Sequence, residues 1–384
     1  MANPVRNTEN RYAFIDALRA AAVLLVVVAH AGLGNIIPGG SGVTIFFTVS
    51  GFIICTIVLR EYDRTNGFDL ARFYARRLLK IGPPFLLIVL IPTIVYSISQ
   101  SINWLQVAGQ AFFLFNWQYM SGQTAVLPGS GVVWSLSIEE QFYVGFAILW
   151  ILALLTPKPV QKIAVLAVAC SLVPLILRVI LNFDSVDHAR TYYGTDTRID
   201  GIAIGILTAL LYRSITKMDS NSRMRNLLGR TRKIAISYAA FVFAIGFYLA
   251  SLIIRDELFR ETLRYSMQAV AAAILILYGL LREHGRVHAL LMKFVSWRPV
   301  QIIGLASYSI YLCHLILISL TSELVSGQNS VVQILFKIST SIVLGCIIWA
   351  LLERPVENWK KRVPWLTGSS PTRSHSAVSS EGSR

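Results

Sequence analysis

Long apolar stretches, separated by short polar segments, run along almost the whole chain. A helix of about 20 mostly apolar residues is long enough to cross the hydrocarbon core of a bilayer. The pattern therefore predicts an all-α, polytopic membrane bundle of about ten transmembrane helices. Their expected ranges are 12–34, 42–60, 80–99, 133–156, 161–182, 198–214, 233–254, 262–281, 301–322 and 331–353.

Three segments do not fit the pattern of spanning helices. Residues 104–119 are apolar and aromatic but too short to span, which predicts an interfacial or re-entrant element. Residues 61–80 form an amphipathic, basic stretch that is expected to lie along the inner membrane surface. Residues 367–384 are rich in Ser and lack an apolar period, so we expect a disordered cytoplasmic tail after a transmembrane domain at 1–366.

Composition supports a membrane protein and sets its expected orientation. The chain of 384 residues is 55% hydrophobic and 14% charged, outside the usual range for soluble proteins. Its net charge of +15 comes from residues that lie between apolar runs, so no nucleic-acid partner is expected. Most Lys and Arg residues fall in segments that become cytoplasmic if both termini are inside, which is the orientation that the positive-inside rule favours. The predicted outer loops hold only Arg190, Arg198, Arg255, Arg260 and Arg264.

The first predicted span carries a polar stripe. Asp16 and Arg19 lie one helical turn apart near its inner end, where they could simply pair and face water. His30 lies eleven residues beyond Arg19, three turns along and on nearly the same face, at an axial distance of about 16 Å. A single buried histidine is more often a packing residue, but a stripe of this kind favours the lining of a cavity.

The fourth span begins with residues 134–143 (W-S-L-S-I-E-E-Q-F-Y), which place two carboxyl groups in its outer half. Glu139 and His30 lie at similar depth, so we expect them to meet, although Glu140 could take this place. A carboxylate beside an imidazole fixes its tautomer, as a general base requires. The alternative is a structural hydrogen bond between packed helices.

Other charged residues have both a functional and a structural interpretation. Arg76, Arg77 and Lys80 could hold an anionic ligand, or they could be anchors of the positive-inside type. Arg198 and Asp200 could contact an external substrate or pair with each other. Ordinary structural roles are expected for the remaining ones: snorkelling for Arg178 and Lys337, packing for His314, and a helix stop for Glu353 and Arg354. The four cysteines lie in apolar runs without a C-x-x-C pair, so neither a disulfide framework nor a metal site is expected.

Four motifs, in order, resemble those of the integral membrane acyltransferase family 3. They are residues 16–19 (D-A-L-R) with His30, residues 42–52 (G-V-T-I-F-F-T-V-S-G-F), residues 73–83 (F-Y-A-R-R-L-L-K-I-G-P) and residues 134–143. Lys80 stands where the family usually has Arg, so a bidentate phosphate contact there becomes a point charge.

The resemblance implies a membrane-embedded O-acyltransferase of the inner (plasma) membrane, in its stand-alone transmembrane form. Such enzymes use acyl-CoA, commonly acetyl-CoA, as donor substrate and hold no permanently bound cofactor. The acceptor would be a hydroxyl of an extracytoplasmic glycan or a lipid-linked saccharide. His30 would be the catalytic base, assisted by Glu139.

The other site residues are divided between the two substrates. The donor would bind at Arg19, Arg76, Arg77 and Lys80, and the acceptor near Trp134, Ser137, Arg198 and Asp200. A transient acyl group on Ser50 or Ser137 is a variant of the mechanism. Two other classes stay open at this point: a transporter or flippase of a polysaccharide precursor, whose polar groups would line a path, and a non-catalytic subunit of a polysaccharide synthesis complex.

Overall fold

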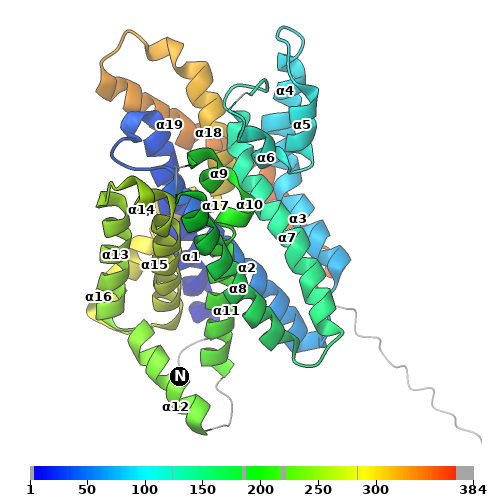
Figure 1. The fold of residues 1–384 in the computed structure, drawn as a ribbon, viewed down its shortest axis with the longest axis vertical. Coiled ribbons are helices and arrows are strands. Elements are labelled where there is room, and N and C mark those ends of the chain that lie inside the picture. Colours follow the sequence, from blue (N-terminus) through cyan, green and yellow to red (C-terminus); the bar gives the residue numbers. More distant parts are fainter. Residues whose placement is uncertain (1–3, 123, 184–186, 218–221, 283, 369–384) are drawn as a thin grey trace, which may run out of the picture.

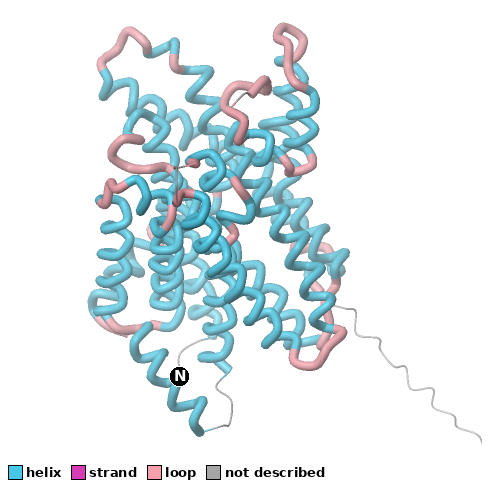
Figure 2. Tube along the Cα trace, in the orientation of Figure 1, coloured by secondary structure: helices cyan, strands magenta, loops and turns pink. Residues whose placement is uncertain are grey.

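The computed structural model describes residues 4–122, 124–183, 187–217, 222–282 and 284–368. Within these ranges every regular element is a helix (Figure 2), which confirms the predicted all-α class. The expected disordered tail at 367–384 lies outside the described residues except for its first two positions.

Eleven of the described helices have fourteen or more residues, and most of these stand side by side as a bundle (Figure 1). They are α1 (Pro4–Val28), α2 (Gly40–Thr65), α3 (Leu70–Phe85), α7 (Val133–Leu154), α8 (Pro159–Leu181), α11 (Asp200–Lys217), α12 (Ser222–Ala235), α13 (Tyr238–Ile253), α15 (Leu263–Leu281), α18 (Ser307–Thr321) and, as the last of the long helices, α19 (Ser330–Ile348).

Shorter helices connect the bundle. They are α4 (Ile91–Tyr96), α5 (Trp104–Ala111), α6 (Phe115–Tyr119), α9 (His188–Tyr193), α10 (Thr195–Arg198), α14 (Glu257–Glu261), α16 (Arg286–Val295), α17 (Arg298–Leu305), α20 (Arg354–Lys360) and α21 (Pro364–Thr367). Three π-helical turns, Ala29–Leu33, Leu86–Leu90 and Trp349–Glu353, continue α1, α3 and α19.

Seven helices are long and apolar enough to cross a membrane, and nine spans result if two bent helix pairs each count as one. The chain is thus a multi-pass membrane protein, with one candidate span fewer than expected. The missing one is the predicted span 198–214, which is α11. This 18-residue helix carries Asp200, Arg213 and Lys217, and these three charges exclude it from the count.

Three further expectations about the membrane segments are corrected or confirmed. The predicted span 301–322 is broken, because α17 and α18 meet at an angle of 73°. The segment 104–119 forms α5 and α6, each too short to span, as expected. The basic stretch before span three is not a separate helix, because α3 begins at Leu70 and is continuous with the span that ends at Tyr96.

Close backbone contact holds the centre of the bundle, where α2 packs against α11 as well as α1 and α15. A Cβ atom on Gly51 of α2 would lie 2.8 Å from the backbone carbonyl carbon of Ile202 in α11. A Cβ atom on Gly205 of α11 would lie 2.8 Å from the backbone nitrogen of Phe52 in α2. Without a water-driven hydrophobic effect in lipid, such small residues let helices approach closely enough for extensive dispersion contact.

Candidate active site

The basic cluster, Arg76, Arg77 and Lys80, lies in the middle of α3. Asp69 caps this helix, because its carboxylate accepts a hydrogen bond from the backbone N–H of Arg72 at 2.9 Å. The same bond, together with the Arg72 guanidinium, holds the pKa of Asp69 below its usual value. The cap fixes where the helix begins. Along α3, Arg76 bonds the Leu366 carbonyl of α21, Arg77 faces α7, and Lys80 lies near Glu357 of α20.

Arg77 is the centre of a charged group that joins α3 to α7. Its guanidinium lies 2.9 Å from Glu140 and 4.0 Å from Glu139, and it stacks over the ring of Tyr143 at 3.1 Å from the centroid. A planar guanidinium can bond a carboxylate and stack on an aromatic ring at once, which an ammonium group does less well. Arg77 is therefore held by three residues of one helix face.

Lys80 contacts the end of the last long helix. Its Nζ lies 3.3 Å from Glu353 and 3.9 Å from Glu357. Glu353 is 3% exposed and also accepts hydrogen bonds from the backbone N–H and the hydroxyl of Ser309, at 3.2 and 2.6 Å. Glu353 thus joins α3, α18 and the final π-helical turn, which is more than the helix stop expected from the sequence.

A cavity of about 570 Å³ runs along this cluster into the bundle. All four residues expected to bind the donor line it, although they come from two separate segments of the chain. The lining cations are Arg19, Arg76, Arg77, Lys80, Lys360 and Lys361. The lining carboxylates are Glu61, Glu139 and Glu357, so cations predominate, as suits an anionic ligand. Deeper in, the walls are apolar or carry hydroxyl groups, among them those of Ser50, Ser135 and Tyr311.

Glu139 belongs to this cavity and does not contact His30 as predicted. Its carboxylate accepts a hydrogen bond from the Ser50 hydroxyl at 3.0 Å and lies near Arg77. Similar depth in the membrane did not bring the two residues together, because depth does not determine which face of a helix a residue occupies. Glu140 also pairs with Arg77 instead of His30.

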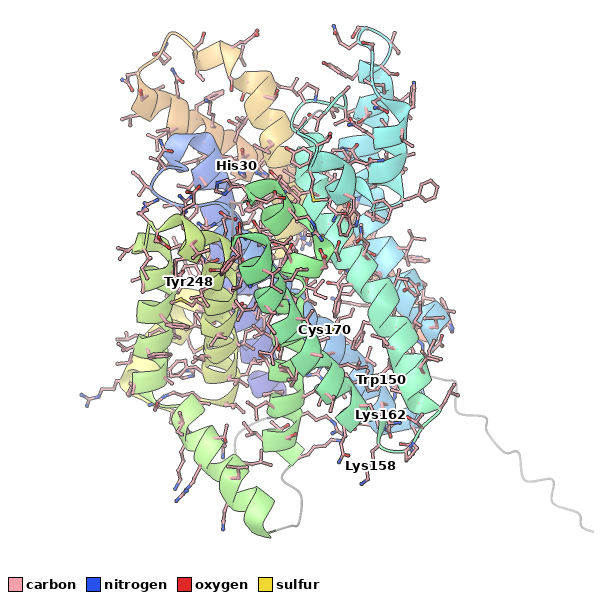
Figure 3. All side chains as sticks on the ribbon, in the orientation of Figure 1. His30, Trp150, Lys158, Lys162, Cys170 and Tyr248 are labelled. Atoms are coloured by element: carbon pink, nitrogen blue, oxygen red, sulfur yellow. The ribbon has the colours of Figure 1, made fainter. Side chains whose placement is uncertain are left out.

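The partner of His30 is His314 of α18. Nδ1 of His30 lies 3.1 Å from Nε2 of His314, and the ring centroids are 5.1 Å apart. His30 is exposed, whereas His314 is completely buried. In Figure 3, His30 lies in the upper part of the bundle, far from Lys158 and Lys162 near the opposite end.

His30 lies in a π-helical turn at the end of α1, where Gly32 has a φ of 133° that a residue with a side chain rarely adopts. Such turns are frequent at functional sites. His30 does not line the cavity in the described structure, but Tyr311 does, and the Tyr311 ring lies 5.6 Å from that of His314. Tyr311 therefore separates the cavity from the histidine pair.

Sequence reasoning assigned His314 to packing, although a signal for it was present. Ser307, Tyr311 and His314 recur at i, i+4 and i+7 within an apolar helix, which places them on one face. Lys360 and Lys361 were missed because they follow the last span, where basic residues are common for orientation alone.

The expected acceptor residues are only partly at the cavity. On α7, Ser135 and Glu139 face it, whereas the Ser137 hydroxyl is buried and donates to the Val133 carbonyl at 3.0 Å. Ser135, one helical turn before Glu139, thus lines the cavity, whereas Ser137 does not.

Trp134 and Arg198 come together next to the cavity wall. The Arg198 guanidinium lies 5.9 Å from the Trp134 ring, 5.8 Å from Phe47 and 3.9 Å from Tyr265. Phe47 itself lines the cavity. Arg198 is 1% exposed, so in this state it is enclosed by aromatic rings.

Asp200 pairs with a residue that the sequence assigned to snorkelling. Its carboxylate lies 2.8 Å from the guanidinium of Arg178, and both side chains are almost completely buried. Arg178 does not reach the membrane surface as expected, because it also bonds the carbonyls of Thr197 and Thr262 inside the bundle. Asp200 is thereby a structural ion partner that joins α11 to α8, away from the cavity.

In the described part of the chain, no group of three or more His, Cys, Asp or Glu residues is arranged so that it could hold a metal ion. The site therefore combines a cation-rich cavity at one end with a pair of imidazoles at the other. Such a set can bind an anionic ligand and exchange a proton with a hydroxyl group.

Comparisons with known proteins agree with the motifs. The Acyltransferase domain family matches residues 12–350. The O-acetyltransferase OatA of Staphylococcus aureus strains NCTC 8325 and COL is 30% identical over 355 residues, which cover 89% of this chain and 56% of OatA. A second protein of strain COL, SACOL0978, is 29% identical over 352 residues, with the same shares.

The chain thus spans a little over half the length of these relatives. No solved structure matches it significantly. Because the family match extends over most of the chain and over nearly all the long helices, the chain belongs to the acyltransferase family 3.

Proposed function

We propose that this protein is a membrane O-acyltransferase of the plasma membrane. It moves an acyl group, acetyl in the simplest case, from acyl-CoA on the cytoplasmic side to a hydroxyl of an extracytoplasmic glycan or lipid-linked saccharide. The observation that carries the proposal is the single cavity lined by Arg19, Arg76, Arg77 and Lys80, which extends to the neighbourhood of the two histidines.

The donor side of the proposal rests on charge. The phosphates of CoA are anionic, and six cations line the cavity against three carboxylates. Arg77 and Lys80 are already paired with carboxylates, so donor binding exchanges some of these contacts for contacts with phosphate. The pantetheine arm then lies along the apolar walls and carries the thioester towards Tyr311.

The chemical step takes place where donor and acceptor meet, beyond Tyr311. His30 removes the proton from the acceptor hydroxyl while its oxygen attacks the thioester carbonyl carbon. The tetrahedral intermediate collapses, the carbon–sulfur bond breaks, and the CoA thiolate leaves and takes up a proton. Because Tyr311 separates the cavity from the histidines, the thioester reaches His30 only past this side chain.

The direct test uses purified protein in detergent with labelled acetyl-CoA and a glycan extract of the producing cells. Wild-type protein is expected to transfer the label to glycan, whereas His30→Ala loses at least about 100-fold in rate, since general bases contribute about that much. His284→Ala is a matched control, because this exposed histidine lies between α15 and α16.

Three outcomes would contradict the proposal. A wild-type rate in His30→Ala would show that His30 is not the catalytic base. A transporter would leave all label on CoA in every variant, and a non-catalytic subunit would not bind acetyl-CoA at all.

A further inference from the structure

We propose that His314 is a positioning residue that holds His30 in the tautomer with its proton on Nδ1, so that Nε2 is free to accept the proton of the acceptor hydroxyl. The inference rests on the proposed role of His30. It adds a residue of α18, 284 positions away in sequence, to the proton-transfer apparatus on α1.

The buried ring determines the direction of the hydrogen bonds. Nδ1 of His314 lies 2.6 Å from the carbonyl oxygen of Tyr311. A carbonyl oxygen only accepts, so this nitrogen carries the hydrogen. A neutral imidazole has one N–H, which leaves Nε2 of His314 as an acceptor. In the described structure the polar contacts of this ring are the backbone carbonyls of Tyr311 and Ile310 and the ring of His30, and no carboxylate that would stabilise a charged ring is among them.

The proton of His30 then has one consistent position. Its Nδ1 lies 3.1 Å from Nε2 of His314 and 3.0 Å from the carbonyl oxygen of Val26, one turn back on α1. Both partners are acceptors, so Nδ1 must be the donor. The opposite assignment, with a hydrogen on Nε2 of His314, would point lone pairs at both the Tyr311 and the Val26 carbonyl oxygens.

Two acceptors also fix the orientation of the His30 ring. The Val26 carbonyl belongs to the same helix and moves with it, whereas His314 ties the ring to α18. The two rings are inclined by 44°. Gly39 also lies against the His30 ring, because a Cβ atom added to Gly39 would be 3.5 Å from Cε1 of His30. The Nδ1 edge is thus occupied, and Nε2 is the nitrogen left for substrate.

During the reaction one proton moves from the acceptor hydroxyl to His30 and then to the CoA thiolate. The acceptor O–H bond breaks as the new oxygen–carbon bond forms, and the proton moves to Nε2 of His30. The resulting imidazolium keeps its Nδ1–H bond to Nε2 of His314, and this lone pair stabilises the positive charge of the His30 ring without transfer of a second proton. The proton on Nε2 then neutralises the departing CoA thiolate, which restores the starting tautomer.

The test compares two amide variants of the full chain in detergent. In His314→Asn the amide replaces Nδ1 and keeps the bond to the Tyr311 carbonyl, but it leaves His30 with the Val26 carbonyl as its one remaining described acceptor. In His314→Gln the amide oxygen reaches the position of Nε2 and can accept from His30. We expect kcat to fall at least about tenfold in the Asn variant, with KM for acetyl-CoA within about twofold of wild type, and to recover largely in the Gln variant.

Three results would overturn the inference: a wild-type kcat in His314→Asn, equal losses in both variants with donor binding intact, or a loss expressed in KM alone. The proposed function is tested separately by His30→Ala, so a negative result for the two His314 variants would overturn the inference alone.

A second measurement determines the tautomer directly in wild-type protein, so it does not depend on a variant that folds. In wild-type protein labelled with ¹⁵N-histidine, we expect His30 to show an unprotonated Nε2 and a protonated Nδ1. The other tautomer would overturn the proposal.

Discussion

At the scale of single residues, the cations of the cavity differ in their surroundings. Arg77 and Lys80 are paired with carboxylates of α7 and of the final segments. Lys361 is exposed and also lines the cavity, at the mouth formed by α20 and α21 with α3. The paired cations keep the cavity in shape before ligand arrives, whereas a cation at the mouth can contact a phosphate without breaking a buried pair.

Lys361→Gln is therefore expected to weaken acetyl-CoA binding by about two- to fivefold, since one exposed ionic contact contributes about 0.5–1 kcal/mol. The turnover rate at saturating donor should not change. Titration calorimetry in detergent measures the affinity, and Lys158→Gln is the control, because Lys158 lies far from His30 and outside the cavity lining. Equal affinities in both variants would exclude Lys361 from the donor site.

The residues of this cavity were largely predictable, but their partners were not. Arg19, Arg76, Arg77 and Lys80 stand out because charge inside or beside an apolar span is costly. Their pairing depends on the rotation of α7 and α18 about their axes. Ser135 faces the cavity, whereas Ser137, two positions later, does not. The sequence alone does not show how each helix is rotated about its axis.

At the scale of helices, the crossing of α2 and α11 holds the site together. α2 carries Ser50, which bonds Glu139, and it packs on α11 through the close approach at Gly51 and Gly205. α11 in turn carries Asp200, whose buried pair with Arg178 fastens α8. The position of the cavity wall thus depends on backbone contacts far from the charged cluster.

Gly205→Val is expected to lower stability in detergent by about 1–3 kcal/mol, because the added side chain would overlap the α2 backbone and force the helices apart. Thermal unfolding of purified protein measures the effect. Gly246→Val on α13 is the matched control, since no described atom lies within 4 Å of a Cβ atom there. Similar midpoints for both variants would show that the close approach does not hold the bundle.

Helix number and type followed from the apolar period, whereas the bends did not. The angle of 73° between α17 and α18 has no proline at the junction around Ala306, so nothing in the local sequence announced it. That bend leads into α18, which carries Tyr308, Tyr311 and His314 and packs against α1. The charged residues of α11 can be identified in the sequence. The packing of α11 against α2 depends on tertiary contacts that the sequence does not show directly.

At the scale of the whole molecule, the proposed mechanism places the cation-rich cavity and the histidine pair on the two sides of one path. The labelled lysines Lys158 and Lys162 lie near the end opposite to His30 (Figure 3), and the positive-inside rule predicts that their end is cytoplasmic. Donor and acceptor would therefore arrive from opposite faces, and Tyr311 would separate them until both are bound.

The most direct test of this account uses proteoliposomes in which all molecules share one orientation, checked by impermeant labelling of a Lys158→Cys variant. Labelled acetyl-CoA is added on the face of Lys158 and the glycan acceptor on the face of His30. The account predicts that label appears in the glycan with this arrangement, and not when the two substrates exchange sides. Transfer only when both substrates share one face would contradict it.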